Sequence, residues 1–166
     1  MPNDLKEKLL ELQYEFRDLG YFSLVKRQHM HLTLKFFGDI PDKKVNEVKE
    51  ALKEIKFKKF DIEAKGLGVF PSKDYIKILW VSVKSDKLYE LQTKIQKILR
   101  NFPDDKKFHA HLTLARVKKI KDKEKFKEKL KNKFYHSFHV NSFNLFKSKL
   151  TSEGPIHEVV ESYELS

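Results

Sequence analysis

The sequence predicts an α+β protein with two pseudo-symmetric lobes, each an antiparallel sheet backed by helices, around a central cleft. Helical and strand-like patterns alternate along the whole chain, which is the pattern of mixed folds. A hexapeptide also occurs twice, as HMHLTL at 29–34 and as HAHLTL at 109–114. The 166 residues contain no low-complexity linker, so we expect one domain, residues 1–166, with an internal pseudo-repeat.

The first half of the chain reads as helix, strand, helix and strand. A helix begins with Asn3 or Asp4 as its cap, runs to about Leu19 and stops at Gly20. A strand rich in Leu, Val, Thr and Phe follows at 24–37. A turn then leads into a helix with one apolar face, and alternating apolar residues predict a further strand. These last two elements are marked by Val45, Val48, Leu52 and Ile55, and by Phe60, Ile62 and Ala64.

The second half repeats this order. The chain bends at 66–71 into a mostly buried strand at 75–83, and a helix with an apolar face follows. The second hexapeptide lies in a strand at 108–117, and a lysine-rich helix at 122–131 comes after it. Two strands, at about 135–147 and 156–165, close the chain. The helix after the buried strand is marked by Leu88, Leu91, Ile95, Ile98 and Leu99, and the lysine-rich helix by Phe126 and Leu130.

Composition limits the classes of function. The chain has no cysteine, which excludes disulfides, zinc–thiolate sites and thiol nucleophiles. Its net charge of +11 is typical of a protein that binds a polyanion such as nucleic acid, and solubility alone is the alternative explanation. No stretch has the length of a membrane span and the N-terminus has no apolar signal core. We therefore expect a cytoplasmic protein that does not contact a membrane.

The repeated hexapeptide joins a titratable side chain to a hydroxyl at a fixed spacing. Side chains alternate across a strand, so the two leucines of each copy point one way and the His-x-Thr pair points the other. The leucine face is expected to pack under helices. The other face, with His31 and Thr33 in one copy and His111 and Thr113 in the other, is expected to line the cleft.

Two histidines across a cleft suit acid–base chemistry. Imidazole titrates near neutral pH, so one ring can accept a proton while the other donates one. A threonine two residues further on offers a short donor to an anionic oxygen. One base, one acid and several donors are what displacement at phosphorus requires, and this chemistry needs no metal.

Other interpretations of the histidines remain open. The pairs His29/His31 and His109/His111 form HxH patterns, which can bind zinc in a hydrolase. A further alternative, from another class of function, is a module that binds RNA without turnover. A threonine and a half-buried histidine are also ordinary strand residues.

A few other side chains are candidates for smaller roles. Tyr75 follows a turn and is the better candidate to stack on a nucleobase, whereas Trp80 lies in an apolar run and is expected to pack in the core. The remaining histidines have no partner pattern and are interpreted as residues on strand surfaces. They are His136, His139 and His157.

The paired HxTx motifs resemble those of the two-histidine (2H) phosphoesterase superfamily. Within it, the chain is similar to the prokaryotic RNA 2′,3′-cyclic phosphodiesterases, long described as 2′-5′ RNA ligases. The resemblance extends from about residue 4 to the end of the chain. The segments that carry it are HLTLKFFGDI, GLGVFPSKDYIKILWVSV, FHAHLTLARV and LFKSKLTSEGPIHEVVESYEL.

The resemblance implies a role for each motif residue. His31 would be the proton donor and His111 the proton acceptor, while Thr33 and Thr113 would hold the phosphate. Arg116 matches an arginine of the family's second motif. Simple alternation places Arg116 on the leucine side, so it needs a twist or a bulge to reach the other four.

The resemblance also implies a reaction. The enzyme would hydrolyse RNA 2′,3′-cyclic phosphate ends to 2′-phosphomonoesters, with RNA as its partner. From the residues themselves we also expect no metal or cofactor, and we expect a monomer. The reverse reaction, 2′-5′ ligation to a 5′-hydroxyl, is an alternative because the same residues catalyse both directions. The family usually has a short apolar strand before its first helix, whereas this sequence begins almost at the helix. We therefore expect either that the start of the sequence is miscalled or truncated, or that the sheet is one strand short.

Overall fold

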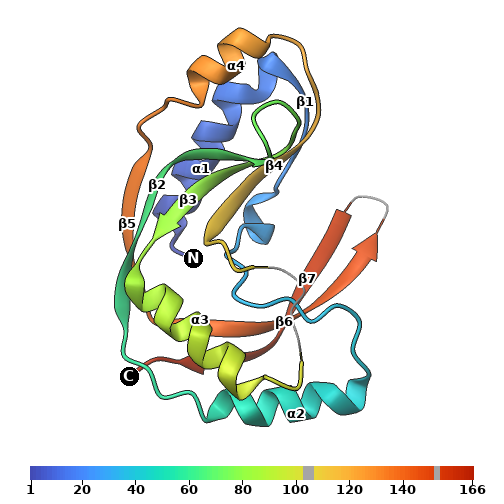
Figure 1. The fold of residues 1–166 in the computed structure, drawn as a ribbon, viewed down its shortest axis with the longest axis vertical. Helices are drawn as coiled ribbons and strands as arrows, with labels where there is room; N and C mark the ends of the chain where they lie inside the picture. The colour runs from blue at the N-terminus through green and yellow to red at the C-terminus, as the bar shows by residue number, and fades with distance from the viewer. Residues whose placement is uncertain (103–106, 152–153) are drawn as a thin grey trace. The chain divides into compact units, whose positions relative to one another are not determined.

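The computed structural model describes residues 1–102, 107–151 and 154–166, without the side chains of residues 150, 151, 154 and 155. Helices and antiparallel strand pairs confirm the α+β class (Figure 1). The helices are α1 (Asn3–Phe16), α2 (Asp42–Lys53), α3 (Asp86–Ile98) and α4 (Lys123–Lys129), with 3₁₀ turns η1 (Arg17–Leu19) and η2 (Arg27–His29). The strands are β1 (Gly20–Leu24), β2 (Phe60–Pro71), β3 (Ile76–Lys84), β4 (His111–Ile120), β5 (Tyr135–Val140), β6 (Ser142–Thr151) and β7 (Gly154–Glu164).

The chain divides into two compact units. Unit 1 comprises Met1–Leu32, Ile62–Lys84 and Ala110–Phe138, and unit 2 comprises Thr33–Asp61, Ser85–His109 and His139–Ser166. Within the described ranges, no helix is long and apolar enough to cross a bilayer. The expectation of a single domain over 1–166 stays a prediction.

Unit 1 is built on a curved sheet with the strand order β1-β4-β3-β2-β5. The β1–β4, β4–β3 and β3–β2 pairs are antiparallel. Helices α1 and α4 pack on one face, where the ring of Phe126 lies 5.3 Å from that of Phe16 and 6.2 Å from that of Phe22. Leu112 and Leu114 of β4 are buried on this face, as the sequence pattern predicts.

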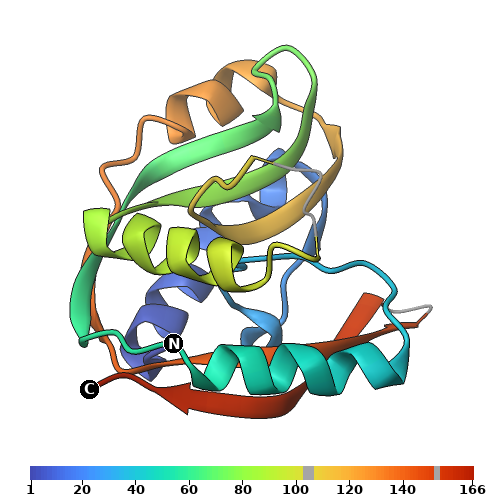
Figure 2. The same ribbon diagram turned by 60° about the horizontal axis from the view of Figure 1, so that its bottom comes forward.

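Unit 2 contains the β6–β7 hairpin with helices α2 and α3. Figure 2 shows α2 lying along the hairpin. The Nζ atom of Lys49 on α2 forms an ion pair with Glu161 of β7 at 2.9 Å, and the Tyr163 hydroxyl donates to the Lys49 carbonyl at 3.3 Å. The buried residues Val48 and Leu52 face inward from α2, as their spacing predicts.

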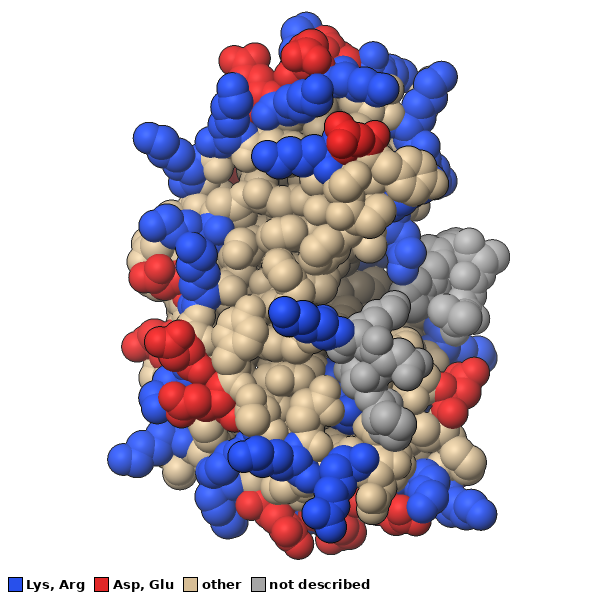
Figure 3. Space-filling model, viewed as in Figure 1, with Lys and Arg blue, Asp and Glu red and all other residues tan. Residues whose placement is uncertain are grey.

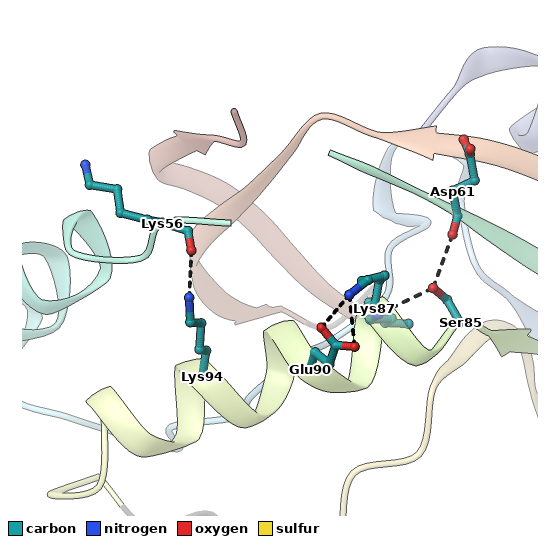
Figure 4. Close-up of polar contacts among 7 residues, drawn as sticks. Lys56, Asp61, Ser85, Lys87, Glu90 and Lys94 are labelled. Carbon is teal, nitrogen blue, oxygen red and sulfur yellow. Dashed lines mark hydrogen bonds and ion pairs between the residues drawn. The ribbon is translucent and has the colours of Figure 1, made fainter. Parts of the chain in front are cut away.

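Helix α3 is fixed at its start and near its end (Figure 4). The Ser85 hydroxyl caps the helix by accepting from the Leu88 amide at 3.4 Å, and it also donates to the Asp61 carbonyl at 3.1 Å. Further along, the Lys94 ammonium donates to the Lys56 carbonyl at 2.8 Å. These contacts tie α3 to the start of β2 and to the segment that precedes it.

Each unit combines segments from both halves of the sequence. Helix α1, from the first half, packs in unit 1 with β4, which carries the second hexapeptide. Helix α3, from the second half, lies in unit 2 with residues 33–37, which follow the first hexapeptide. The two compact units are therefore not the two halves of the sequence, because β1 and β4 pair across the repeat.

The first hexapeptide is not in a regular strand, so the predicted strand at 24–37 is wrong in its position. The strand β1 ends at Leu24, and Val25 makes one more bond, its amide donating to the Leu114 carbonyl at 2.9 Å. The 3₁₀ turn at Arg27–His29 then directs the chain out of the ladder. The Leu/Thr pattern favours an extended chain, but a strand also needs a neighbour with which to exchange backbone hydrogen bonds.

Further boundaries differ from the prediction. Residues 66–71 continue β2 rather than bending away, because the register shift between Ala64 and Leu67, with Gly66 at a φ of 74°, absorbs the change in direction. The strand predicted at 135–147 is two strands, β5 and β6, which belong to different sheets. Finally, Asn3 is the first helical residue of α1 and Pro2 occupies the cap position without a side-chain hydrogen bond.

Candidate functional site

The strand β4 begins within the second hexapeptide, at His111 rather than at the predicted residue 108, and the side chains from there on alternate as predicted. Leu112 and Leu114 are almost completely buried, whereas His111 and Thr113 are half-buried on the opposite face. The neighbouring strand β3 pairs Ser82 with His111 and Trp80 with Thr113. The face of the sheet that carries His111 and Thr113 is here called the histidine face.

A β-bulge moves Arg116 to the histidine face. The register of the β3–β4 pair shifts by one residue, because Leu79 pairs with Ala115 while Trp80 pairs with Thr113. Leu114 is the extra residue, and both Leu114 and Ala115 are therefore buried in succession. Beyond the bulge the alternation is reversed, and Arg116 is exposed on the side of His111 and Thr113. This is the bulge that simple alternation required for Arg116 to join them.

Aromatic rings surround His111 on the same face. The Phe70 ring meets the imidazole edge-on at 5.2 Å between centroids, and the Trp80 ring lies 6.1 Å away. Phe70 and Trp80 also contact each other at 4.8 Å. Gly68 lies opposite Trp80, and a Cβ at this position would run into the indole ring. The indole therefore lies across the glycine backbone.

The core position predicted for Trp80 is wrong. Trp80 is only half-buried and lies on the histidine face, because β3 alternates and its buried residues are Leu79, Val81 and Val83. The sequence shows an apolar run at 75–83, which hides this alternation. A glycine at position 68 on the neighbouring strand is the signal that could have indicated an overlying large ring.

The first hexapeptide places its histidine differently. The Nδ1 atom of half-buried His31 lies 2.7 Å from the His29 carbonyl oxygen. A carbonyl oxygen only accepts, so Nδ1 carries the hydrogen and Nε2 is the nitrogen left for chemistry. His31 belongs to unit 1, as do His111, Thr113 and Arg116, whereas the exposed Thr33 belongs to unit 2.

Tyr75 lies in the turn between β2 and β3 and is 60% exposed. Its ring faces the Lys77 ammonium at 4.6 Å, and its amide donates to the Ser72 hydroxyl at 3.2 Å. Ser82, the partner of His111, lies seven positions further along the chain, which is about 23 Å in an extended strand. The role of Tyr75 in base stacking stays a prediction, and the rings beside His111 are those of Phe70 and Trp80.

Among the described residues, no three or more His, Asp or Glu side chains gather in a way that could hold a metal ion. The HxH pairs therefore have no third ligand of these types there. His109, the outer histidine of the second copy, is exposed. The zinc interpretation has no supporting geometry in this part of the chain.

The remaining histidines are not all surface residues. His136 is 9% exposed, with Nε2 lying 3.3 Å from the Asp4 carboxylate, so its predicted surface position is wrong. Its side chain alternates inward on β5. His139 is exposed and pairs with Asp61 at 2.8 Å, and His157 lies 2.8 Å from the Ser148 hydroxyl.

Positive charge is spread widely. In Figure 3, Lys and Arg side chains appear at the α4 end and again over α2 and α3, with acidic side chains among them. Arg116 is one of only four arginines in the chain, the others being at positions 17, 27 and 100. The arginine on the histidine face is therefore a specific feature rather than part of the general lysine excess, and its planar guanidinium suits phosphate oxygens.

A family model for LigT-like phosphoesterases matches the chain twice, over residues 1–80 and 81–157. The chain belongs to this family. Each match contains one hexapeptide, so the twofold match follows the repeat seen in the sequence. The resemblance to 2H phosphoesterases is thereby confirmed.

Relatives of this LigT-like chain span nearly its whole length. A protein of Methanocaldococcus jannaschii is 32% identical over 98% of this chain and 95% of its own. A protein of Aquifex aeolicus is 36% identical over 98% of this chain and 90% of its own. Both are named RNA 2′,3′-cyclic phosphodiesterase.

Solved structures share the fold. The protein TT0787 of Thermus thermophilus superposes with a TM-score of 0.84 at 22% identity, covering 99% of this chain and 93% of that one. E. coli LigT complexed with 3′-AMP superposes with a TM-score of 0.79 at 17% identity, covering 100% of this chain and 93% of that one.

Proposed function

We propose that this chain hydrolyses the 2′,3′-cyclic phosphate at the end of an RNA and leaves a 2′-phosphomonoester. The proposal is carried by one observation: each of the two matches to the LigT-like phosphoesterase family contains one His-x-Thr pair. Full-length relatives named RNA 2′,3′-cyclic phosphodiesterase support the same substrate. RNA is thus the proposed partner, and we expect the protein to act as a monomer in the cytoplasm.

In the proposed reaction, water attacks phosphorus and the bond from phosphorus to the 3′ oxygen breaks. His111 takes the proton of the attacking water. His31 gives a proton to the departing 3′ oxygen, so the product keeps its phosphate on the 2′ oxygen. Each histidine then needs one proton transfer with solvent to return to its starting state.

The geometry of His31 suits a donor. Its Nδ1 hydrogen is engaged by the His29 carbonyl, so the ring is oriented and Nε2 is the donating atom. A carbonyl partner at Nδ1 can stay in place whether or not Nε2 carries a hydrogen. The ring therefore need not rotate during the reaction.

Thr113 and Arg116 suit the anionic oxygens. Both lie with His111 on the histidine face, and Thr33 has the matching place in the first hexapeptide. Hydroxyl and guanidinium donors strengthen their hydrogen bonds as charge grows on the non-bridging oxygens in the transition state.

The test uses a short synthetic RNA ending in a 2′,3′-cyclic phosphate, with EDTA present. We expect a product heavier by one water whose phosphate resists a phosphatase specific for 3′ ends. Removal of the phosphate by that enzyme would mean that the 2′ oxygen leaves, and the assignment of His31 to the 3′ oxygen would be wrong. Binding without any turnover would overturn the hydrolase proposal and favour an RNA-binding module.

A second reaction mixture contains an RNA with a 5′-hydroxyl in addition. Ligation uses the same residues in reverse, with the hydroxyl in place of water. Because water is far more abundant, we expect hydrolysis to dominate. A joined 2′-5′ product as the main species would instead make the chain a ligase.

A further inference from the structure

A second sequence repeat accompanies the hexapeptides. Residues 8–13 read KLLELQ and residues 87–92 read KLYELQ, so the two copies agree at five of six positions. They lie on α1 and α3. The repeated leucines lie on the buried faces of these helices, which explains why the two copies share them. The repeated glutamine is not explained in this way, because a buried amide loses its hydration.

Both glutamines are buried. Gln13 is 3% exposed and Gln92 is 7% exposed, and apart from His136 they are the buried polar residues identified in the described chain. Each donates to a backbone carbonyl of a hexapeptide. The Gln13 amide donates to the Leu114 carbonyl at 2.7 Å, and the Gln92 amide donates to the Leu34 carbonyl at 3.4 Å.

The two acceptors are equivalent positions. Leu34 and Leu114 are each the last residue of a hexapeptide and directly follow the threonine of the His-x-Thr pair. The exchange of segments between the halves makes this arrangement reciprocal. Within unit 1, α1 of the first half reaches the second hexapeptide, and within unit 2, α3 of the second half reaches the first.

Gln13 forms hydrogen bonds to two backbone carbonyls rather than one. Its amide nitrogen also donates to the Val25 carbonyl at 2.9 Å, and the Val25 amide donates to the Leu114 carbonyl. Leu114 is the bulged residue that reverses the alternation of β4 and carries Arg116 to the histidine face. The glutamine therefore fixes the bulge and also the point at which the chain leaves β1 toward His31.

We propose that Gln13 and Gln92 are paired positioning residues, each of which holds the threonine of the opposite half's hexapeptide in its place for phosphate binding. This inference rests on the proposed function. Gln13 acts through the Leu114 carbonyl on Thr113 and Arg116. Gln92 acts through the Leu34 carbonyl on Thr33.

The test replaces each glutamine by methionine, which keeps the length of the side chain and removes its donors. We expect Gln13→Met and Gln92→Met each to lower kcat/KM for the cyclic-phosphate RNA by about tenfold, the scale of one buried hydrogen bond. Leu5→Ala and Leu88→Ala are the controls. They remove buried apolar side chains from the same two helices, so they lower the melting temperature without removing a motif contact.

Double variants separate positioning from stability. In a Thr113→Ala background, Gln13→Met should cost about threefold or less, because the threonine hydroxyl that Gln13 positions through the Leu114 carbonyl is already gone. In a Thr33→Ala background, Gln13→Met should keep its roughly tenfold cost. Gln92→Met should show the reverse pattern. Equal costs in both backgrounds, or losses that follow the melting temperature as in the leucine controls, would overturn the proposal.

Hydrogen exchange provides a reading that does not depend on turnover. Gln13→Met should speed exchange of the β1 and β4 amides that flank Leu114, while Gln92→Met should leave them at the wild-type rate. If the wild-type protein has no turnover but the two glutamine variants show this exchange pattern, the proposed function alone is refuted. Active wild-type protein with unchanged exchange in Gln13→Met would refute the positioning role alone.

Discussion

His31 and His111 have different contacts although nearly identical hexapeptides surround them. The Nδ1 atom of His31 faces a carbonyl oxygen, whereas His111 lies among the rings of Phe70 and Trp80. A backbone carbonyl fixes the orientation and the tautomer of a ring, and aromatic neighbours limit its access to water. The two histidines are thus suited to unequal tasks, which agrees with one proton donor and one acceptor.

The proposed roles predict unequal costs for the four motif histidines. Loss of a general acid or base typically costs about 10²–10⁴-fold, so His31→Ala and His111→Ala should each lose turnover on that scale while remaining folded. His29→Ala and His109→Ala should lose far less, because the proposal gives their side chains no proton to move. Steady-state kinetics with the cyclic-phosphate RNA and circular dichroism provide the measurement. Equal losses in the outer pair would favour a metal site instead.

Gly68 allows the indole of Trp80 to lie beside His111. A Cβ at position 68 would overlap the ring, so Gly68→Ala should displace the indole and weaken turnover. Trp80 is the only tryptophan, so its fluorescence reports the movement directly. The matched control is Gly38→Ala, where a Cβ meets no neighbour within 4 Å although the backbone φ of 65° favours glycine. An unchanged emission maximum in Gly68→Ala would show that the ring is not held by this contact.

At the scale of the elements, β4 shows how one extra residue changes the composition of a face. Without the bulge at Leu114, Arg116 would point to the side of α1 and Ala115 to the side of His111. Burying a guanidinium among apolar side chains is costly, so the bulge and the arginine depend on each other. The strand therefore contributes buried side chains to the core as far as Val117, and up to that point three polar side chains lie on its other face.

The strand β7 contains a group whose titration should affect stability. Burial, and then the negative charges of Glu161 and Glu50, raise the pKa of Tyr163 from 10.0 to about 12. The folded protein keeps this proton while the unfolded chain loses it near pH 10. The contribution of Tyr163 to stability is therefore complete below about pH 10 and is lost as the pH rises toward 12.

We accordingly expect wild-type protein to lose more free energy of unfolding between about pH 9 and pH 11 than Tyr163→Phe does. Urea unfolding at the two pH values gives the measurement. The control is Tyr14→Phe, because Tyr14 is 61% exposed, and this variant should behave as wild type. Identical losses in wild type and Tyr163→Phe would mean that burial and the neighbouring carboxylates do not raise the pKa of this hydroxyl.

At the scale of the whole molecule, the charge of +11 should matter for long substrates. Lysines that neutralise RNA phosphates release counterions, so log K for a single strand falls with log salt by roughly 0.7 per contacted phosphate. We expect KM for a long cyclic-phosphate RNA to rise steeply with salt, and KM for a cyclic mononucleotide to rise little. Parallel slopes for the two substrates would assign the excess charge to solubility alone.

The whole chain should also be indifferent to chelators. The proposed chemistry uses imidazole, hydroxyl and guanidinium groups, and the sequence supplies no thiolate ligands. Turnover is expected to survive excess EDTA, and elemental analysis of the active protein is expected to find no stoichiometric zinc. Loss of activity with EDTA that is restored by zinc would overturn the assignment of His31 and His111.

The sequence by itself determined the α+β class, the family and the residues of the paired motifs. These follow from local patterns: the 3.6-residue apolar periods of α2 and α3, the alternation in β4, and a hexapeptide written twice. The repeat KLxELQ was equally visible. Its importance was not, because leucines at helical spacing are ordinary core residues and only the acceptor of the glutamine shows that it reaches a motif.

Only the tertiary structure decided where the motif residues lie. The exchange of segments between the halves, the departure of the first hexapeptide from the sheet and the bulge at Leu114 all depend on which strand pairs with which. Backbone pairing joins residues far apart in the sequence, as in the bond from Val25 to Leu114, and no local propensity encodes such a partner. The same pairing moves Arg116 to the face of His111, since a shift of one residue in register reverses the side on which every later side chain of β4 lies. It also pairs Trp80 with Thr113, so the regular alternation of β3 places the indole on that face rather than in the core.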